Sequence, residues 1–247
     1  MSLTVKTVFV TGASRGLGLS ICRALLSVGG VHVIGASRGA FNANTLDTLY
    51  GAASRGGAPK RRTFFTPLED VDVSDAGARN SLPLRVATAL GEARLDILVN
   101  CAGVFPPLAS GWNTETYASA MAVNCLGALK VTRALVPSMS LVDAHVINVT
   151  SGYSKHIGEG YRRLLDSLTA SSDVESLPFL PNNDVADVPV AYNISKAALN
   201  KGTILMAAEL LKSKYKIRIN AVDPGCAYYY YYYFFYMNIF STTTTPF

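Results

Sequence analysis

Short apolar stretches alternate along the chain with longer stretches in which apolar residues recur every three or four positions. The apolar stretches that predict strands are 7–10, 31–36, 95–100, 144–150 and 217–222, with a less regular one at 62–73 that Pro67 interrupts. The longer stretches predict helices over 16–28, 75–90, 115–136 and 190–213. Strands that alternate with helices are typical of a parallel sheet covered on both faces. We therefore predict an α/β fold, a Rossmann-like doubly wound parallel sheet in a single domain.

Two segments depart from this alternation. Residues 156–189 are polar and contain several prolines, and we interpret them as an insertion over the ligand-binding edge of the sheet. Residues 226–247 include six consecutive tyrosines from Tyr228 to Tyr233, which is typical of a low-complexity tail. The predicted organisation is thus a dinucleotide-binding and catalytic domain over 1–225, followed by the tail.

Composition narrows the class of protein. Of the 247 residues, 49% are hydrophobic and 16% charged, which is a globular composition. The net charge of +5 is scattered apart from Lys60, Arg61 and Arg62, so we expect no nucleic-acid partner. The four cysteines (Cys22, Cys101, Cys125 and Cys226) show no metal-binding spacing, and neither a secretory signal nor a membrane-spanning run is apparent. We expect a cytoplasmic protein with reduced thiols, no metal and no membrane association.

The segment VFVTGASRGLG places three glycines between a predicted strand and a predicted helix. A loop in this position provides a tight turn, close approach of the backbone to a pyrophosphate, and free amides at the positive end of a helix. Glycines also mark ordinary turns, but the strand-turn-helix context favours a nucleotide site. The candidate cofactor-binding residues of the loop are Gly12, Ser14, Arg15, Gly16, Leu17 and Gly18.

Charge at the end of the second predicted strand indicates which nucleotide is bound. A carboxylate there suits the ribose hydroxyls of NAD, whereas the 2′-phosphate of NADP needs a cation. The chain has Ser37 and Arg38 at this place without an adjacent acid, and Arg15 adds a second guanidinium. We predict NADP(H); the alternative is that Arg38 is only a solvated loop residue.

Tyr192 and Lys196 are four residues apart on a predicted helix, so both side chains lie on one face. A free tyrosine has a pKa of about 10, and a neighbouring ammonium is expected to lower it towards neutrality. Ser151 follows a predicted strand at the edge of the sheet where ligands bind, and its hydroxyl is placed to hydrogen-bond a carbonyl.

These motifs resemble those of the short-chain dehydrogenase/reductase family. The family loop TGxxxGxG matches from Thr11 to Gly18, and NCAG at 100–103 resembles the family's NNAG, with Cys101 in place of the second asparagine. The resemblance implies cofactor contacts from further residues: Asp72, Val73, Asn100, Ala102, Gly103, Tyr192, Lys196, Pro224 and Gly225. It also implies a catalytic set in which Tyr192 donates a proton, Ser151 orients the carbonyl, Lys196 holds the ribose and tunes the tyrosine, and Asn124 supports a water relay.

The implied reaction is the reduction of a small-molecule ketone or aldehyde by NADPH. The 41 positions that separate Ser151 from Tyr192 resemble the helical insertion of monomeric carbonyl reductases, so we expect a monomer or a homodimer. The alternative is that the insertion is only an elaboration of the surface. Phe105, Trp112 and Tyr153 are candidate pocket residues, although core packing explains aromatic residues equally well.

The resemblance covers residues 5–225 and ends there, which predicts that the chain lacks the family's final strand and substrate lid. Two alternatives follow: a non-catalytic NADP(H)-binding protein, or a truncated gene product without function.

Overall fold

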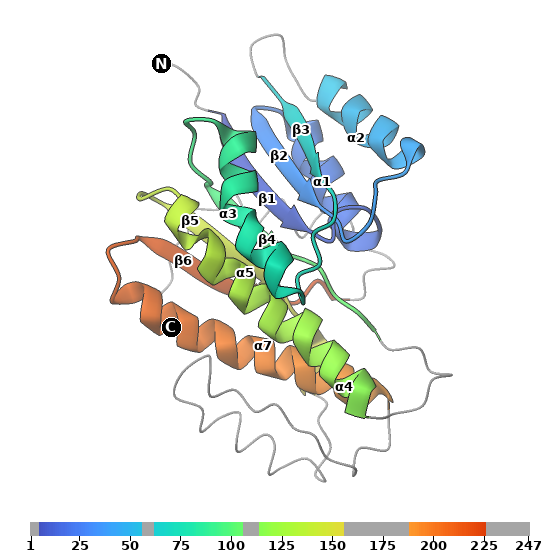
Figure 1. Cartoon of the computed structure of the whole chain (residues 1–247), viewed down its shortest axis with the longest axis vertical. Helices are drawn as coiled ribbons and strands as arrows, with labels where there is room; N and C mark the ends of the chain where they lie inside the picture. Colours follow the sequence, from blue (N-terminus) through green and yellow to red (C-terminus); the bar gives the residue numbers. More distant parts are fainter. Residues whose placement is uncertain (1–4, 56–61, 106–113, 156–187, 226–247) are drawn as a thin grey trace.

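A single six-stranded sheet organises the protein, as seen in the computed structural model (Figure 1), which describes residues 5–55, 62–105, 114–155 and 188–225. The strands are β1 (Lys6–Thr11), β2 (Val31–Ala36), β3 (Phe64–Leu68), β4 (Ile97–Asn100), β5 (Ala144–Val149) and β6 (Ile217–Val222). Their order is β3-β2-β1-β4-β5-β6, and every neighbouring pair is parallel. The strand order reverses between β1 and β4, the switch point at which open parallel sheets bind ligands. The predicted doubly wound fold is confirmed.

Helices follow the strands in the order that the hydrophobic pattern predicts. They are α1 (Gly16–Val28), α2 (Ala43–Arg55), α3 (Ala76–Leu90), α4 (Thr114–Met121), the π-helix η2 (Ala122–Gly127), α5 (Ala128–Leu135), the 3₁₀ turns η3 (Val136–Ser138) and η4 (Gly152–Lys155), and α7 (Val188–Leu211). The predicted helix at 115–136 is therefore α4, η2 and α5 in continuous succession.

Helix α2 is the element that the sequence pattern did not predict. Its start is marked by Asn42, whose side-chain oxygen accepts a hydrogen bond of 2.8 Å from the backbone N–H of Thr45. Such a cap satisfies a free amide of the first helical turn and was a usable sequence signal. The remaining difference is small: the strand at 62–73 is shorter than predicted and runs through Pro67, which an outer strand tolerates.

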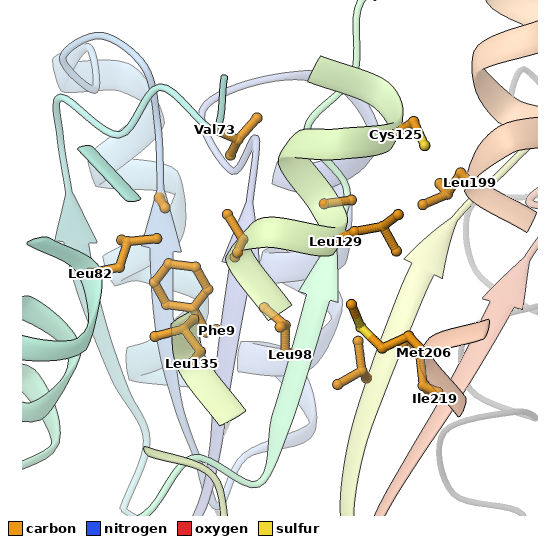
Figure 2. Packing of buried hydrophobic residues seen from close by; sticks show 14 of the residues in the cluster. Phe9, Val73, Leu82, Leu98, Cys125, Leu129, Leu135, Leu199, Met206 and Ile219 are labelled. Carbon is orange, nitrogen blue, oxygen red and sulfur yellow. The ribbon is translucent and has the colours of Figure 1, made fainter. Parts of the chain in front are cut away.

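The sheet separates two hydrophobic cores because successive side chains of a strand point to opposite faces. On one face Val8 and Val10 of β1 pack with Leu26 of α1. On the other face Phe9 packs with residues from α3, α5 and α7, and Figure 2 shows Leu82, Leu129 and Leu135 among them. Both faces are therefore dry, which holds the ends of the strands in a fixed position.

The helical stretch Glu115–Ser138 is long and apolar enough to span a bilayer by composition alone. Most of the apolar part of this stretch is buried within the protein, where Met121, Leu129 and Leu135 belong to the core. These contacts are those of a core helix.

Several predictions concern residues outside the described ranges. These are the body of the insertion (156–187), the tail (226–247) with the missing strand and lid, and Lys60, Arg61, Trp112 and Cys226. Within the described residues, β6 is an outer strand of the sheet.

Candidate active site

A cavity of about 760 Å³ opens at the carboxyl ends of the strands, beside the switch point between β1 and β4. Its volume lies within the range of about 300–1,000 Å³ that is usual for small-molecule sites. The predicted site residues that line it are Gly12, Ser14, Arg15, Gly16, Leu17, Gly18, Arg38, Asp72, Val73, Ala102, Gly103, Ser151, Tyr192, Lys196, Pro224 and Gly225. Asn100 and Asn124 do not line the cavity. The fold therefore brings most of the candidate cofactor-binding residues and three of the four candidate catalytic residues into one cavity.

The glycine loop is packed too tightly for side chains. A Cβ atom on Gly18 would lie 2.2 Å from the carbonyl oxygen of Gly12, and one on Gly12 would lie 2.9 Å from the Cα of Ala102. Gly12 also has a φ of 71°, in the left-handed region that favours glycine. Arg15, the N-cap of α1, makes no capping hydrogen bond with its side chain. The loop thus offers bare backbone and uncapped helix amides to an anion.

The end of β2 carries the residues that the sequence linked to the choice of nucleotide. The Ser37 hydroxyl donates a hydrogen bond of 2.9 Å to the Ser14 hydroxyl, which joins this strand end to the glycine loop. Arg38 is exposed and lines the cavity. Ser37 was named only as a neighbour of Arg38, yet it also lines the cavity, and its place beside the glycine loop was the usable signal.

Asp72 lies in a turn after β3 and faces the same part of the cavity. Burial by itself would raise the pKa of this carboxyl. Hydrogen bonds from the Ser74 hydroxyl and backbone, together with the positive charges of Arg38 and Arg79, outweigh burial and hold the pKa below its ordinary value. The carboxylate is therefore ionised at neutral pH, as an acceptor for donor groups of a ligand.

Asn100 at the end of β4 and Cys101 in the turn after it lie in different surroundings. Cys101 lines the cavity, and its backbone N–H donates to the Thr11 hydroxyl at 3.0 Å. Asn100 is 3% exposed, and its side-chain amide donates to Thr132 at 2.9 Å and to Asn148 at 2.8 Å. The structure therefore gives Asn100 a place in the core between β4, β5 and α5. Its side chain is engaged in these core hydrogen bonds and does not line the cavity, and the predicted cofactor contact of Asn100 stays a prediction.

Ser151 and Tyr192 form the centre of the predicted catalytic set. Ser151 follows β5, and its hydroxyl accepts a hydrogen bond of 3.3 Å from the backbone N–H of Tyr153. The side chains of Ser151 and Tyr192 are also hydrogen-bonded to each other. A hydroxyl and a phenol therefore meet at the edge of the cavity, where they can act together on one acceptor atom.

The pKa of Tyr192 differs from the sequence-based expectation. Burial raises the pKa of this phenol above its ordinary value, the hydrogen bond with Ser151 acts in the opposite direction, and the negative charge of Asp223 raises the pKa further. The lowering towards neutrality expected from Lys196 together with a bound cofactor is not met in the protein alone, where loss of contact with water disfavours the phenolate more than the hydrogen bond stabilises it. Tyr192 is thus a neutral phenol, which is the proton-donating form.

Lys196 lies one turn further along α7 and is 4% exposed. Its Nζ donates a hydrogen bond of 2.8 Å to the Val149 carbonyl oxygen and lies 5.6 Å from the centroid of the Tyr192 ring. Burial lowers the pKa of Lys196 to about 8. The ammonium is therefore charged at neutral pH, next to the phenol and facing the cavity.

Asn124 lies in the π-helix η2 and is 1% exposed. Its side-chain oxygen accepts from the Val104 N–H at 2.7 Å, and its amide donates to the Val104 carbonyl oxygen at 2.9 Å. Asn124 thus holds the loop after β4, a wall of the cavity, through both backbone groups of one residue. π-helical turns are frequent at functional sites, and the predicted water relay through Asn124 stays a prediction.

Aromatic residues cover the mouth of the cavity near Tyr192. Phe105 is 52% exposed, and its ring centroid lies 4.9 Å from that of Tyr192. Tyr153 is 59% exposed and lines the same cavity. Both were candidates from the sequence; Val104, Val123 and Thr150 also line the cavity and were not predicted. Within the described ranges, no group of three or more His, Cys, Asp or Glu residues is arranged to hold a metal ion.

Comparison with known proteins places this site in context. A family model described as short chain dehydrogenase matches residues 6–162. The (+)-neomenthol dehydrogenase of Arabidopsis thaliana is 30% identical, over 90% of this chain and 83% of that protein.

Solved structures agree with this match. A metagenomic short-chain oxidoreductase in complex with NADP is 27% identical, with a TM-score of 0.62 over 91% of this chain and 84% of that one. An NAD⁺-bound xylitol dehydrogenase, 20% identical, shares the fold with a TM-score of 0.64 over 91% of this chain and 72% of that one. Similar proteins therefore include one bound to NADP and one bound to NAD⁺.

Proposed function

Because the chain belongs to the short-chain dehydrogenase family, we propose that it is an NADPH-dependent reductase that converts a ketone or an aldehyde to an alcohol. The observation that carries this proposal is that Ser151, Tyr192 and Lys196 line the same cavity as the glycine loop and Arg38. A proton donor is thus held in the same cavity as a phosphate-binding loop.

The residues present fit NADP(H). Gly12 and Gly18 leave no room for a Cβ, so the loop backbone is open to a pyrophosphate beside the uncapped start of α1. Arg38 supplies a guanidinium for the 2′-phosphate. The NADP complex of a similar protein supports this choice, and the NAD⁺ complex of another makes a direct test necessary. When bound, the cofactor supplies the hydride that the carbonyl carbon accepts.

The chain's own residues then handle the substrate oxygen. The Ser151 hydroxyl hydrogen-bonds the carbonyl oxygen and orients it. Tyr192, a neutral phenol because burial raises its pKa, donates its proton to that oxygen as negative charge develops on it. The Lys196 ammonium stabilises the phenolate that results, since an opposite charge nearby favours the ionised form. Oxidation of an alcohol is the same sequence in reverse.

The walls of the cavity favour a broad range of carbonyl substrates, as in carbonyl reductases. Phe105 and Tyr153 are more than half exposed beside the proton donor, so they present aromatic faces to a substrate rather than charged groups. We propose uncharged aromatic ketones, aldehydes and dicarbonyls as substrates, for an enzyme that acts in the cytoplasm.

The test is the oxidation of NADPH by the purified protein with a panel of aromatic and dicarbonyl substrates. Tyr192→Phe should lower kcat about 100-fold or more, since a positioned general acid contributes about 10²–10⁴-fold, while NADPH binding persists. Tyr50→Phe is the matched control, because Tyr50 lies on α2 and does not line the cavity. Binding of NADPH by the wild type without turnover of any substrate would contradict catalysis and favour a non-catalytic NADP(H)-binding protein.

A further inference from the structure

Ser195 lies on α7 between the two proposed catalytic residues, and its side chain faces the core. It is 0% exposed and does not line the cavity. Its hydroxyl donates a hydrogen bond of 2.8 Å to the Tyr192 carbonyl oxygen and accepts one of 3.0 Å from the Asn124 side-chain amide. A fully buried hydroxyl that both donates and accepts a hydrogen bond links two elements, here α7 and η2.

Asn124 extends this link from Ser195 to the loop after β4. The Asn124 amide that donates to Ser195 also donates to the Val104 carbonyl oxygen, and its oxygen accepts from the Val104 N–H. The loop is close-packed against the site: a Cβ on Gly103 would lie 3.3 Å from the Asn124 oxygen and 3.8 Å from the Lys196 Nζ. Phe105, which follows Val104 in this loop, contacts the Tyr192 ring.

We propose that Ser195 is a positioning residue, which through Asn124 ties the loop after β4 to the turn of α7 that carries Tyr192 and Lys196. This inference rests on the proposed function, because it assigns Ser195 a part in the same reaction. One hydroxyl thereby connects two walls of the reaction chamber, the proton-donating helix and the loop that bears Phe105.

Removal of the Ser195 hydroxyl should affect the loop after β4 more than the glycine loop. The Asn124 amide loses one of its two buried acceptors, and a buried polar group without a partner favours rearrangement. The loop then loosens at Val104, and the distance between Tyr192 and the substrate oxygen varies more. The glycine loop and Arg38 belong to other elements, so the loss of affinity for NADPH is smaller than the loss of turnover, although Gly103 and Lys196 also line the cavity.

The test compares Ser195→Ala with Thr203→Val. Thr203 is a close match on the same helix: it is 4% exposed, accepts from the Asn148 amide at 2.8 Å and donates to the Leu199 carbonyl oxygen at 2.7 Å. It does not line the cavity. The first measurement is hydrogen exchange of the Val104 amide, followed by NMR in the apo protein. The second is the separation of kcat from KM for NADPH.

In Ser195→Ala we expect Val104 exchange about tenfold faster, the effect of one lost hydrogen bond. We also expect kcat about tenfold lower, with a smaller change in KM for NADPH. Thr203→Val should change neither. Ser195→Cys, which keeps a weak donor and acceptor of similar size, should lie between wild type and Ser195→Ala and serves if Ser195→Ala does not fold.

Unchanged Val104 exchange in Ser195→Ala overturns the proposal, and so does equal acceleration by Thr203→Val. The exchange measurement needs no turnover. An inactive wild type that shows the selective acceleration would therefore refute the proposed reaction while the link through Asn124 stands.

Discussion

The Nζ atom of Lys196 lies 5.6 Å from the centroid of the Tyr192 ring, and its hydrogen bond goes to the Val149 carbonyl oxygen instead of the phenol. The two side chains are close enough for the ammonium to act on a phenolate through charge. They are not coupled by a hydrogen bond that holds the tyrosine ionised beforehand. This arrangement suits a tyrosine that starts the reaction as an acid and becomes a stabilised anion only after it has donated its proton.

Burial of the Lys196 ammonium should make the stability of the protein depend on pH. The pKa of Lys196 is lowered from 10.5 to about 8 in the folded state. Between these two values the unfolded chain holds more protons than the folded protein, so the free energy of unfolding rises with pH. Below pH 8 the full cost of the buried charge is present.

Lys196→Met should therefore abolish turnover and yet raise the free energy of unfolding at neutral pH by roughly 1–3 kcal/mol. The gain should shrink as the pH rises above about 8 and vanish near the unfolded pKa. Urea unfolding at a series of pH values measures this difference. Lys212→Met, at an exposed position just beyond α7, should show no such trend, and a gain that is independent of pH would contradict the assigned cause.

Charge reversal at Arg38 should weaken binding of NADPH selectively. Arg38→Glu replaces a phosphate-binding guanidinium by a carboxylate, so we expect the Kd for NADPH to rise roughly 10- to 100-fold and that for NADH to fall. Fluorescence titration with both nucleotides measures the two constants. Arg23→Glu makes the same change of charge at an exposed position of α1 that does not line the cavity. Equal losses in the two variants would show that only the overall charge matters.

Gly18→Ala should disrupt the glycine loop, because the added Cβ would lie 2.2 Å from the Gly12 carbonyl oxygen. Backbone atoms cannot move aside as a flexible side chain can, so we expect a loss of stability of about 1–3 kcal/mol together with loss of NADPH binding. Gly39→Ala is the control for stability, since nothing lies within 4 Å of its added Cβ. Thermal unfolding with and without NADPH distinguishes the variants, and equal melting temperatures would refute the close packing.

Asn100→Ala should destabilise the core without a direct effect on the cofactor. It removes the donor to Thr132 and Asn148 and leaves those buried groups short of a partner, at a cost of about 1–3 kcal/mol. Asn148→Ala interrupts the same row of hydrogen bonds one strand further on and should cost a similar amount. Affinity for NADPH, measured at a temperature where both variants are folded, should stay close to that of the wild type. A large loss of affinity in Asn100→Ala alone would restore the expected cofactor contact.

The strands and most helices were predictable because their causes are local. A buried parallel strand is apolar on both faces, so β2 is visible as a short, mostly apolar run. The outer strand β6 instead alternates buried apolar residues with exposed polar ones, Arg218 and Asn220, and it too lies at the position predicted. Helix α2 was missed although Leu46, Leu49 and Ala52 recur at helical spacing on its core side and Asn42 caps its start. The residues of the glycine loop and the Tyr192–Lys196 pair were identifiable for the same local reason, since each motif places its members by chain geometry alone.

The roles of the polar residues were less predictable because they depend on partners that are distant in sequence. Asn100 and Cys101 are neighbours in one motif, yet Thr132 and Asn148 keep the first in the core while the second lines the cavity. Ser195 was not singled out at all, since its function depends on Asn124, 71 positions earlier in the chain.

The sequence by itself determined the order of the elements, the loop that can accept a phosphate, and the tyrosine and lysine on one helix face, because each follows from residues a few positions apart. Only the tertiary structure decided which polar groups are dry, which face the cavity, and in which direction the pKa of Tyr192 moves. Burial and hydrogen bonding are produced by packing between segments that are distant in the chain, and the groups that act on the pKa of Tyr192 come from η4 and from the turns after β4, β5 and β6.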